Sequence, residues 1–165
     1  MWERISEEVW EQQVGHVARY QMAQQLLEPG DVVLDATCGI GYGKQVLGID
    51  SYVGIDREPV TAFQGDFRVE DLDMWEPDFN FSIGLCFETL EHLQNPQRWL
   101  NIMLKASRLA MFSVPTIPTK HFNEFHLHDF TVDQILVWLD GYEVEVIPQP
   151  EEVSHIFIVK TKASI

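Results

Sequence analysis

Positive charge is scarce in this sequence: its 165 residues contain 11 Lys and Arg against 26 Asp and Glu, which gives a formal net charge of −15. Proteins that bind nucleic acid use lysine and arginine to displace the counterions of the phosphate backbone. The sequence also offers no basic amphipathic helix of the kind that lies on a membrane surface. We therefore expect neither nucleic acid nor a membrane among the partners of this protein.

Cysteine and long apolar runs are scarce as well. The two cysteines, Cys38 and Cys86, fall at the ends of predicted strands and make neither a disulfide framework nor a metal-ligand pair. No apolar stretch approaches the roughly 20 residues of a membrane-spanning helix. The first residues, MWERISEEVWEQQ, are too acidic and polar for a signal or transit peptide. These absences predict a reduced, cytoplasmic protein.

What the sequence does contain is an alternation of short apolar strands and helices. We predict strands at residues 32–34, 52–56, 67–71, 81–87, 109–115, 142–147 and 155–161. Helices are predicted over residues 6–27 with Ser6 as N-cap, 42–47, 96–104, and 132–140 with Thr131 as N-cap. The segment between the second and third strands is too short for a full helix. This order predicts an open α/β sheet whose ligand lies at the carboxyl ends of the strands.

Residues 32–43, VVLDATCGIGYG, run from an apolar strand through an acid into three closely spaced glycines. Gly39, Gly41 and Gly43 permit a tight turn and the close approach of a ligand to the backbone, because glycine has no Cβ. The next strand ends in Asp56, about 20 residues on, where an acid conventionally binds ribose hydroxyls. A carboxylate at Asp35 opposes a diphosphate and suits an ammonium group. A ribose and a positive end together indicate S-adenosylmethionine.

In these motifs the chain resembles the class I S-adenosylmethionine-dependent methyltransferases. VVLDATCGIGYG is similar to the cofactor loop of that family, YVGID to its ribose-binding strand, VEDL to its adenine-side strand end, and CFETLEHLQNP to its fourth strand and the segment that follows. GHVARYQMA, FETLEH, SVP and NEFHLHDFT are similar to a subgroup often associated with sugar or polysaccharide methylation.

The resemblance implies a Rossmann-like, mostly parallel seven-stranded sheet with helices on both faces and a reduced helix between the second and third strands. It also implies a single methyltransferase domain over residues 1–165. Residues 1–28 would form an N-terminal helix that covers the cofactor, and residues 29–165 would form the core. We expect a monomer or a homodimer.

The resemblance further implies a set of cofactor-binding residues. Arg19 would pair with the methionyl carboxylate, although an ordinary surface arginine is an equal alternative, and Asp35 would hold the methionyl ammonium. Asp56 would bind the ribose hydroxyls, and Asp71 and Leu72 would contact the adenine. The other expected contacts come from Gly39, Gly41, Tyr42, Arg57 and Phe87.

The acceptor is expected to be a small molecule or a saccharide, attacked at oxygen, and a hydroxyl acceptor benefits from a base near neutral pKa. His126 is the preferred candidate, because its loop follows the fifth strand; Glu88 and His92 are the others, and a packing or capping role competes at His92. His121, His126, His128 and Asp129 lack a compact metal motif, so we expect a solvated loop and no metal. A non-catalytic cofactor-binding or assembly subunit and a nucleotide-dependent oxidoreductase remain alternatives.

Overall fold

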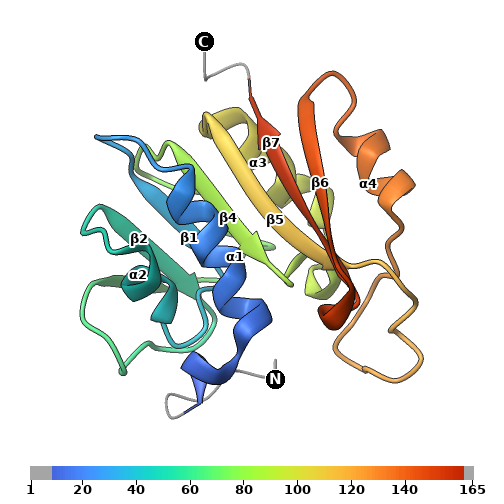
Figure 1. Cartoon of the computed structure of the whole chain (residues 1–165), viewed down its shortest axis with the longest axis horizontal. Helices are drawn as coiled ribbons and strands as arrows, with labels where there is room; N and C mark the ends of the chain where they lie inside the picture. Colours follow the sequence, from blue (N-terminus) through green and yellow to red (C-terminus); the bar gives the residue numbers. More distant parts are fainter. Residues whose placement is uncertain (1–8, 162–165) are drawn as a thin grey trace.

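A seven-stranded sheet forms the centre of the protein in a computed structural model that describes residues 9–161 (Figure 1). The strand order is β3-β2-β1-β4-β5-β7-β6. Neighbours among β1 to β5 are parallel, whereas β7 runs antiparallel to both β5 and β6. The strands are β1 (Val33–Ala36), β2 (Tyr52–Asp56), β3 (Asp66–Val69), β4 (Ile83–Phe87), β5 (Leu109–Pro115), β6 (Glu143–Gln149) and β7 (Ser154–Lys160). The predicted α/β fold with a mostly parallel sheet is confirmed.

The helices cover both faces of the sheet, as predicted. Helices α1 (Val14–Gln25) and α2 (Tyr42–Leu47) pack on one face, whereas α3 (Pro96–Ala106) and α4 (Val132–Trp138) pack on the other. In Figure 1, α1 crosses in front of the sheet and α3 lies behind it. Every residue of β1, β2, β4 and β5 is buried, which explains why these strands read as continuous apolar runs.

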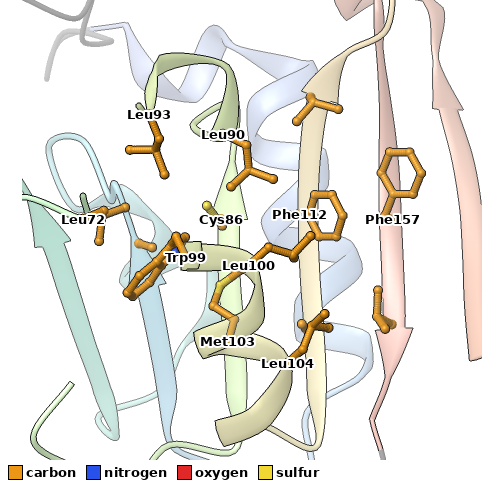
Figure 2. Close-up of a cluster of buried hydrophobic side chains, with 14 of the residues drawn as sticks. Leu72, Cys86, Leu90, Leu93, Trp99, Leu100, Met103, Leu104, Phe112 and Phe157 are labelled. Atoms are coloured by element: carbon orange, nitrogen blue, oxygen red, sulfur yellow. The ribbon is translucent and has the colours of Figure 1, made fainter. Parts of the chain in front are cut away.

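The larger apolar cluster lies under α3. Trp99, Leu100, Met103 and Leu104 of that helix are buried, and they pack with side chains of β4, β5 and β7 (Figure 2). Pro96 occupies the first turn and the side chain of Asn95 caps the helix by accepting from the Arg98 backbone N–H. This helix fixes the segment between β4 and α3, which carries several of the predicted site residues.

Some predicted boundaries were wrong. The N-terminal helix begins at Val14, because Gln13 has a non-helical backbone, and a short 3-10 turn, η1 (Trp10–Gln12), precedes it; the predicted cap Ser6 lies outside the described residues. Strand β4 begins at Ile83, two residues later than predicted; the hydroxyl of Ser82 just before it donates to Asp31 and accepts from the Val32 N–H. Residues 57–65 form no helix between β2 and β3, as the sequence predicts. Thr131 caps α4 in a capping box, also as predicted.

The carboxyl ends of the parallel strands meet at one edge of the sheet, which is the lower edge in Figure 1. The β1–α2 loop, the 3-10 turn η2 (Leu90–His92) and the loop over residues 116–131 lie there, and so does the 3-10 turn η3 (Pro150–Glu152), which joins β6 to β7. None of the helices within residues 9–161 has the length and apolar character needed to cross a membrane.

Candidate functional site

The glycine loop turns sharply between β1 and α2. Gly39 has φ 61° and Gly41, the residue before α2, has φ 94°. Both values lie in the left-handed region that only glycine adopts without cost. A Cβ on Gly41 would also stand 2.7 Å from the Phe67 ring. The loop therefore depends on glycine for its shape, as the motif predicts.

Asp56 ties this loop to the end of β2. The Gly39 N–H donates to its Oδ2 at 2.8 Å, and the Glu58 N–H donates to Oδ1 at 3.2 Å. The Asp56 carbonyl accepts from the Glu70 N–H, which joins the end of β2 to the residue after β3. The carboxylate is thus placed beside the glycine loop, where the sequence predicts ribose binding.

Asp35 is fully buried at the end of β1, and two tyrosines reach it. The hydroxyls of Tyr20 and Tyr52 both donate to Oδ2, the first at 2.9 Å. Its Oδ1 has no hydrogen-bond partner among the described residues. Burial raises the pKa of Asp35 to about 7, and the charge of Asp56 adds to the rise, whereas the two tyrosine hydrogen bonds oppose it.

Gly43 makes the contact between Tyr20 and Asp35 possible. A Cβ at this position would lie 2.3 Å from the Tyr20 ring and 2.9 Å from Oδ2 of Asp35. Tyr42 next to it stacks on Trp10 at 5.3 Å and meets Tyr20 edge to face, also at 5.3 Å. The aromatic rings therefore pack α1 onto α2.

Arg19 is buried, so the surface alternative was wrong. Its Nε donates to the side-chain oxygen of Gln149 at 2.7 Å, and its Nη2 lies 3.6 Å from Oε1 of Glu88. That Nη2 has no hydrogen-bond partner among residues 9–161. A buried guanidinium with an unused donor is a strong candidate for binding a carboxylate.

Glu88 follows β4 in a strained conformation. Its φ is 50°, its N–H donates to the Ser113 carbonyl, and its Oε1 accepts from the Ser154 hydroxyl at 2.5 Å. Burial raises the pKa of Glu88, and Arg19 opposes that rise. Among the described residues, the non-glycine positions with positive φ are Thr37, Glu88 and Val153, and all of them lie at this edge of the sheet. Backbone strain of this kind clusters at functional sites.

The adenine-side residues are spread over different environments. Asp71 is half-exposed, and its carboxylate lies 4.0 Å from the Arg57 guanidinium. Leu72 is buried in the apolar core, where Figure 2 shows it beside Trp99, and its carbonyl accepts from Arg98. Phe87 at the end of β4 packs edge to face on the Tyr20 ring at 5.1 Å. The adenine roles of these residues stay predictions.

His92 and His126 come together although 33 residues separate them. Their ring centroids lie 4.7 Å apart. Nδ1 of His92 bonds to the Phe125 carbonyl at 2.9 Å, and Nδ1 of His126 bonds to the Thr119 hydroxyl at 2.6 Å. Burial lowers the pKa of both histidines, that of His92 to about 4, with the neighbouring His126 contributing to the drop at His92.

Glu91 lies beside both histidines, and the sequence did not single it out as a site residue. Its carboxylate is buried, and its Oε1 is 3.8 Å from Nε2 of His92. Burial, reinforced by the charge of Glu88, holds the pKa of Glu91 well above its usual range. A long-range contact between η2 and the loop after β5 brings His126 to Glu91 and His92, so the FETLEH stretch alone contained no sufficient signal for this group.

The other candidate residues of the loop over residues 116–131 lie apart from Glu91, His92 and His126. Nε2 of His128 bonds to the Leu93 carbonyl, and Asp129 accepts from the backbone N–H groups of Thr119 and Lys120. Phe130 is buried and packs the end of the loop down, whereas Phe122 and Phe125 are exposed. A pocket of about 640 Å³ opens between this loop, the start of α3 and α4, and its walls include Asn95, Gln97, His128, Gln134 and Trp138.

No protein-family model matches the sequence, and no curated protein sequence matches it. Solved structures do share the fold. A chain of the Haloferax volcanii complex between a methyltransferase activator and a candidate methyltransferase gives a TM-score of 0.71 at 15% identity, over 94% of this chain and 93% of that chain. Magnesium protoporphyrin IX methyltransferase from Synechocystis PCC 6803, with bound S-adenosylmethionine, gives 0.63 at 17% identity, over 90% and 81%.

The cyclase SpnF also superposes, with a TM-score of 0.67 at 15% identity over 92% of this chain and 83% of that chain. At these identities the likeness establishes the fold. The cyclase among the neighbours illustrates that one fold supports more than one reaction, so the function has to be argued from the site.

Proposed function

We propose that this chain is an S-adenosylmethionine-dependent methyltransferase that acts on an oxygen of a small-molecule, sugar-type acceptor. The observation that carries the proposal is a pair of buried, oppositely charged side chains with unused hydrogen-bonding atoms, Nη2 of Arg19 and Oδ1 of Asp35. Tyr20 connects them, because it follows Arg19 in α1 and donates to Asp35. The amino-acid end of S-adenosylmethionine carries one carboxylate and one ammonium group. The carboxylate would accept from Nη2 of Arg19, and the ammonium group would donate to Oδ1 of Asp35.

The remaining parts of the cofactor have matching groups along the same edge. The Asp56 carboxylate at the end of β2 suits the ribose hydroxyls, and Asp71 after β3 suits the adenine amine. The backbone of the glycine loop is open at Gly39, where a Cβ would meet nothing within 4 Å, whereas Gly41 packs against Phe67. The bound S-adenosylmethionine of the Synechocystis enzyme, which has the same fold, supports this choice of cofactor.

Methyl transfer needs alignment more than acid–base chemistry. The acceptor oxygen forms a bond to the methyl carbon, the carbon–sulfur bond breaks with its electron pair going to sulfur, and the hydroxyl proton leaves to a base or to water. Glu88, His92 and His126 are the candidate catalytic residues for positioning the hydroxyl and taking that proton. The saccharide acceptor rests on the subgroup motifs; the pocket beside Trp138, whose walls are both polar and apolar, is compatible with a sugar.

Titration calorimetry with S-adenosylmethionine, S-adenosylhomocysteine and NAD⁺ tests the cofactor. We expect binding of the first two and none of the third, and we expect Asp35→Ala to weaken binding while Asp50→Ala, at an exposed position, leaves it unchanged. Binding of NAD⁺ alone would favour the oxidoreductase alternative. A panel of sugar nucleotides, monitored through S-adenosylhomocysteine release, then tests catalysis. Cofactor binding without S-adenosylhomocysteine release would favour a non-catalytic cofactor-binding subunit. The absence of a helix between β2 and β3 is the specific observation that favours this alternative.

A further inference from the structure

Three potential metal ligands converge between η2 and the loop after β5. Glu91, His92 and His126 each offer one ligand atom, and these atoms lie within 4.8 Å of one another. Two contacts hold the segments in this arrangement: the Leu127 N–H donates to the Glu91 carbonyl at 2.7 Å, and the His92 ring bonds to the Phe125 carbonyl. The group is therefore built by the fold and does not result from neighbouring surface side chains.

Glu91 gives the strongest indication that a cation belongs here. Its relative exposure is 1%, and neither carboxylate oxygen has a hydrogen-bond partner among residues 9–161. Leu90 and Leu93 on either side are buried in the apolar core and hold this turn in place (Figure 2). A buried carboxylate without hydrogen bonds is costly, and such groups are normally paired or coordinate a metal.

The hydrogen bonds of the histidines orient them for coordination. The Phe125 carbonyl can only accept, so Nδ1 of His92 carries the proton and Nε2 presents its lone pair. That Nε2 faces Oε1 of Glu91 at 3.8 Å, so two electron-pair donors point toward the same space. Thr119 engages Nδ1 of His126, which leaves Nε2 as its other ring nitrogen. Outer hydrogen bonds of this kind, on the second ring nitrogen, are a regular feature of metal-binding histidines.

We propose that Glu91, His92 and His126 bind one divalent transition-metal ion such as Zn²⁺. Two imidazoles and one carboxylate are the ligand set of several catalytic zinc sites, which keep a further position for water or substrate. Mg²⁺ and Ca²⁺ prefer oxygen ligands alone, so two imidazoles disfavour them. Glu91 forms the buried side of the site, whereas His126 is partly exposed. The coordination position left for water or substrate therefore faces the loop over residues 116–131.

For the reaction, the ion would bind the acceptor hydroxyl and make it more acidic, and the released proton would pass to water. This part rests on the proposed methyl transfer, whereas the metal site itself does not. His92 and His126 would then act as metal ligands, and the preference for His126 as a general base would give way to a role in holding the acceptor through the ion.

Metal binding tests the proposal directly. The protein is stripped with a chelator and titrated with Zn²⁺ and, separately, with Mg²⁺, and bound metal is measured after equilibrium dialysis; Co²⁺ supplies a visible spectrum that reports coordination. We expect one Zn²⁺ per chain, no comparable Mg²⁺ binding, and a rise in melting temperature with Zn²⁺. His126→Gln should weaken Zn²⁺ binding by about a hundredfold or more, since even loss of an outer hydrogen-bonding partner costs roughly 10–100-fold.

The variants include one whose folding is not at risk. Glu91→Gln tests the buried ligand, and His126→Gln changes a loop residue, so the second keeps the test valid if the first does not fold. His121→Gln is the matched control, because His121 is an exposed histidine of the same loop outside the group. Substoichiometric Zn²⁺ binding by the wild type, unchanged affinity in His126→Gln, or an equal loss in His121→Gln would overturn the proposal. Calorimetry with S-adenosylmethionine on the stripped protein is a separate readout, and a failure there counts against the proposed function alone.

Discussion

The Nε atom of Arg19 donates a 2.7 Å hydrogen bond to the side chain of Gln149, a residue 130 positions later in the sequence. The amide nitrogen of Gln149 in turn donates to the Gly15 carbonyl at 3.0 Å. The end of β6 therefore fixes both the first turn of α1 and the direction of the Arg19 guanidinium. A single amide side chain thus connects the last hairpin of the sheet to Arg19, the proposed carboxylate-binding group.

Gln149→Leu is expected to weaken both stability and cofactor binding. The change leaves the Arg19 Nε without this partner and removes the side-chain hydrogen bond to the Gly15 carbonyl, and an unsatisfied buried donor costs about 1–3 kcal/mol of unfolding free energy. A mobile guanidinium should also bind the methionyl carboxylate less well, so calorimetry should show an affinity lower by roughly tenfold. Gln21→Leu, at an exposed position of the same helix, is the control. Unchanged cofactor affinity in Gln149→Leu would separate Arg19 from the carboxylate.

Asp35→Asn should stabilise the unliganded protein at pH 8. The pKa of Asp35 in the folded state is about 7, above its ordinary value of 3.8. The folded state therefore binds more protons than the unfolded state between these values, so this group's contribution to stability is present at low pH and is lost as the pH rises through 7. The wild type should gain melting temperature, relative to Asp35→Asn, between pH 8 and pH 5.

The same variant should lose cofactor affinity, because the ammonium group selects the ionised carboxylate. In the wild type that affinity should rise between pH 5.5 and pH 8, and in Asp35→Asn it should be lower and flatter with pH. Comparing the two proteins cancels the contributions of the other titrating groups. One of these is His92, whose lowered pKa makes stability rise with pH, opposite in sign to the contribution of Asp35. A difference in melting temperature between the two proteins that does not change with pH would mean that Asp35 is ionised throughout this range.

Local sequence was sufficient for the strands, the glycine loop and the capped helices. Each depends on neighbouring residues: a run of buried β-branched side chains, a glycine with positive φ, or a cap such as Thr131. The acid at the end of β2 was placed correctly for the same reason, since the distance along a strand–helix–strand unit is nearly constant.

Contacts between distant segments were not predictable in the same way. The burial of Arg19 depends on Gln149, and the group around Glu91 depends on how the loop after β5 folds back onto η2. The sequence offered four candidate ligands in and beside that loop, and the fold selects only His126 from them. Periodicity describes which face of an element is apolar, but it contains no information on which loops meet.

Asp56→Ala should weaken S-adenosylmethionine binding by roughly tenfold or more, because a hydrogen bond to a charged group contributes about 1.5–3 kcal/mol. The effect has two sources: lost ribose hydrogen bonds, and a looser glycine loop, since Gly39 donates to this carboxylate. Asp56→Asn separates them, because the amide oxygen can still accept from Gly39. Calorimetry on both variants, with Asp50→Ala as the control, measures the difference. An affinity equal to that of the wild type in Asp56→Ala contradicts the ribose assignment.

Gly43→Ala should destabilise the protein, although alanine is the better helix former by about 1 kcal/mol. The added methyl group would stand 2.3 Å from the ring of Tyr20, which is buried between α1 and α2 and has no room to move away. Overpacking of this kind typically costs about 1–3 kcal/mol, and it should also break the hydrogen bond from Tyr20 to Asp35.

Chemical denaturation of the single variants and the double variant with Tyr20→Ala gives the coupling between the two positions. If the clash with Tyr20 causes most of the loss, the cost of Gly43→Ala should fall sharply once the ring is removed, because the gain in helix propensity is then opposed only by the 2.9 Å contact with Oδ2 of Asp35. An equal loss in both backgrounds would show that the glycine is required for another reason.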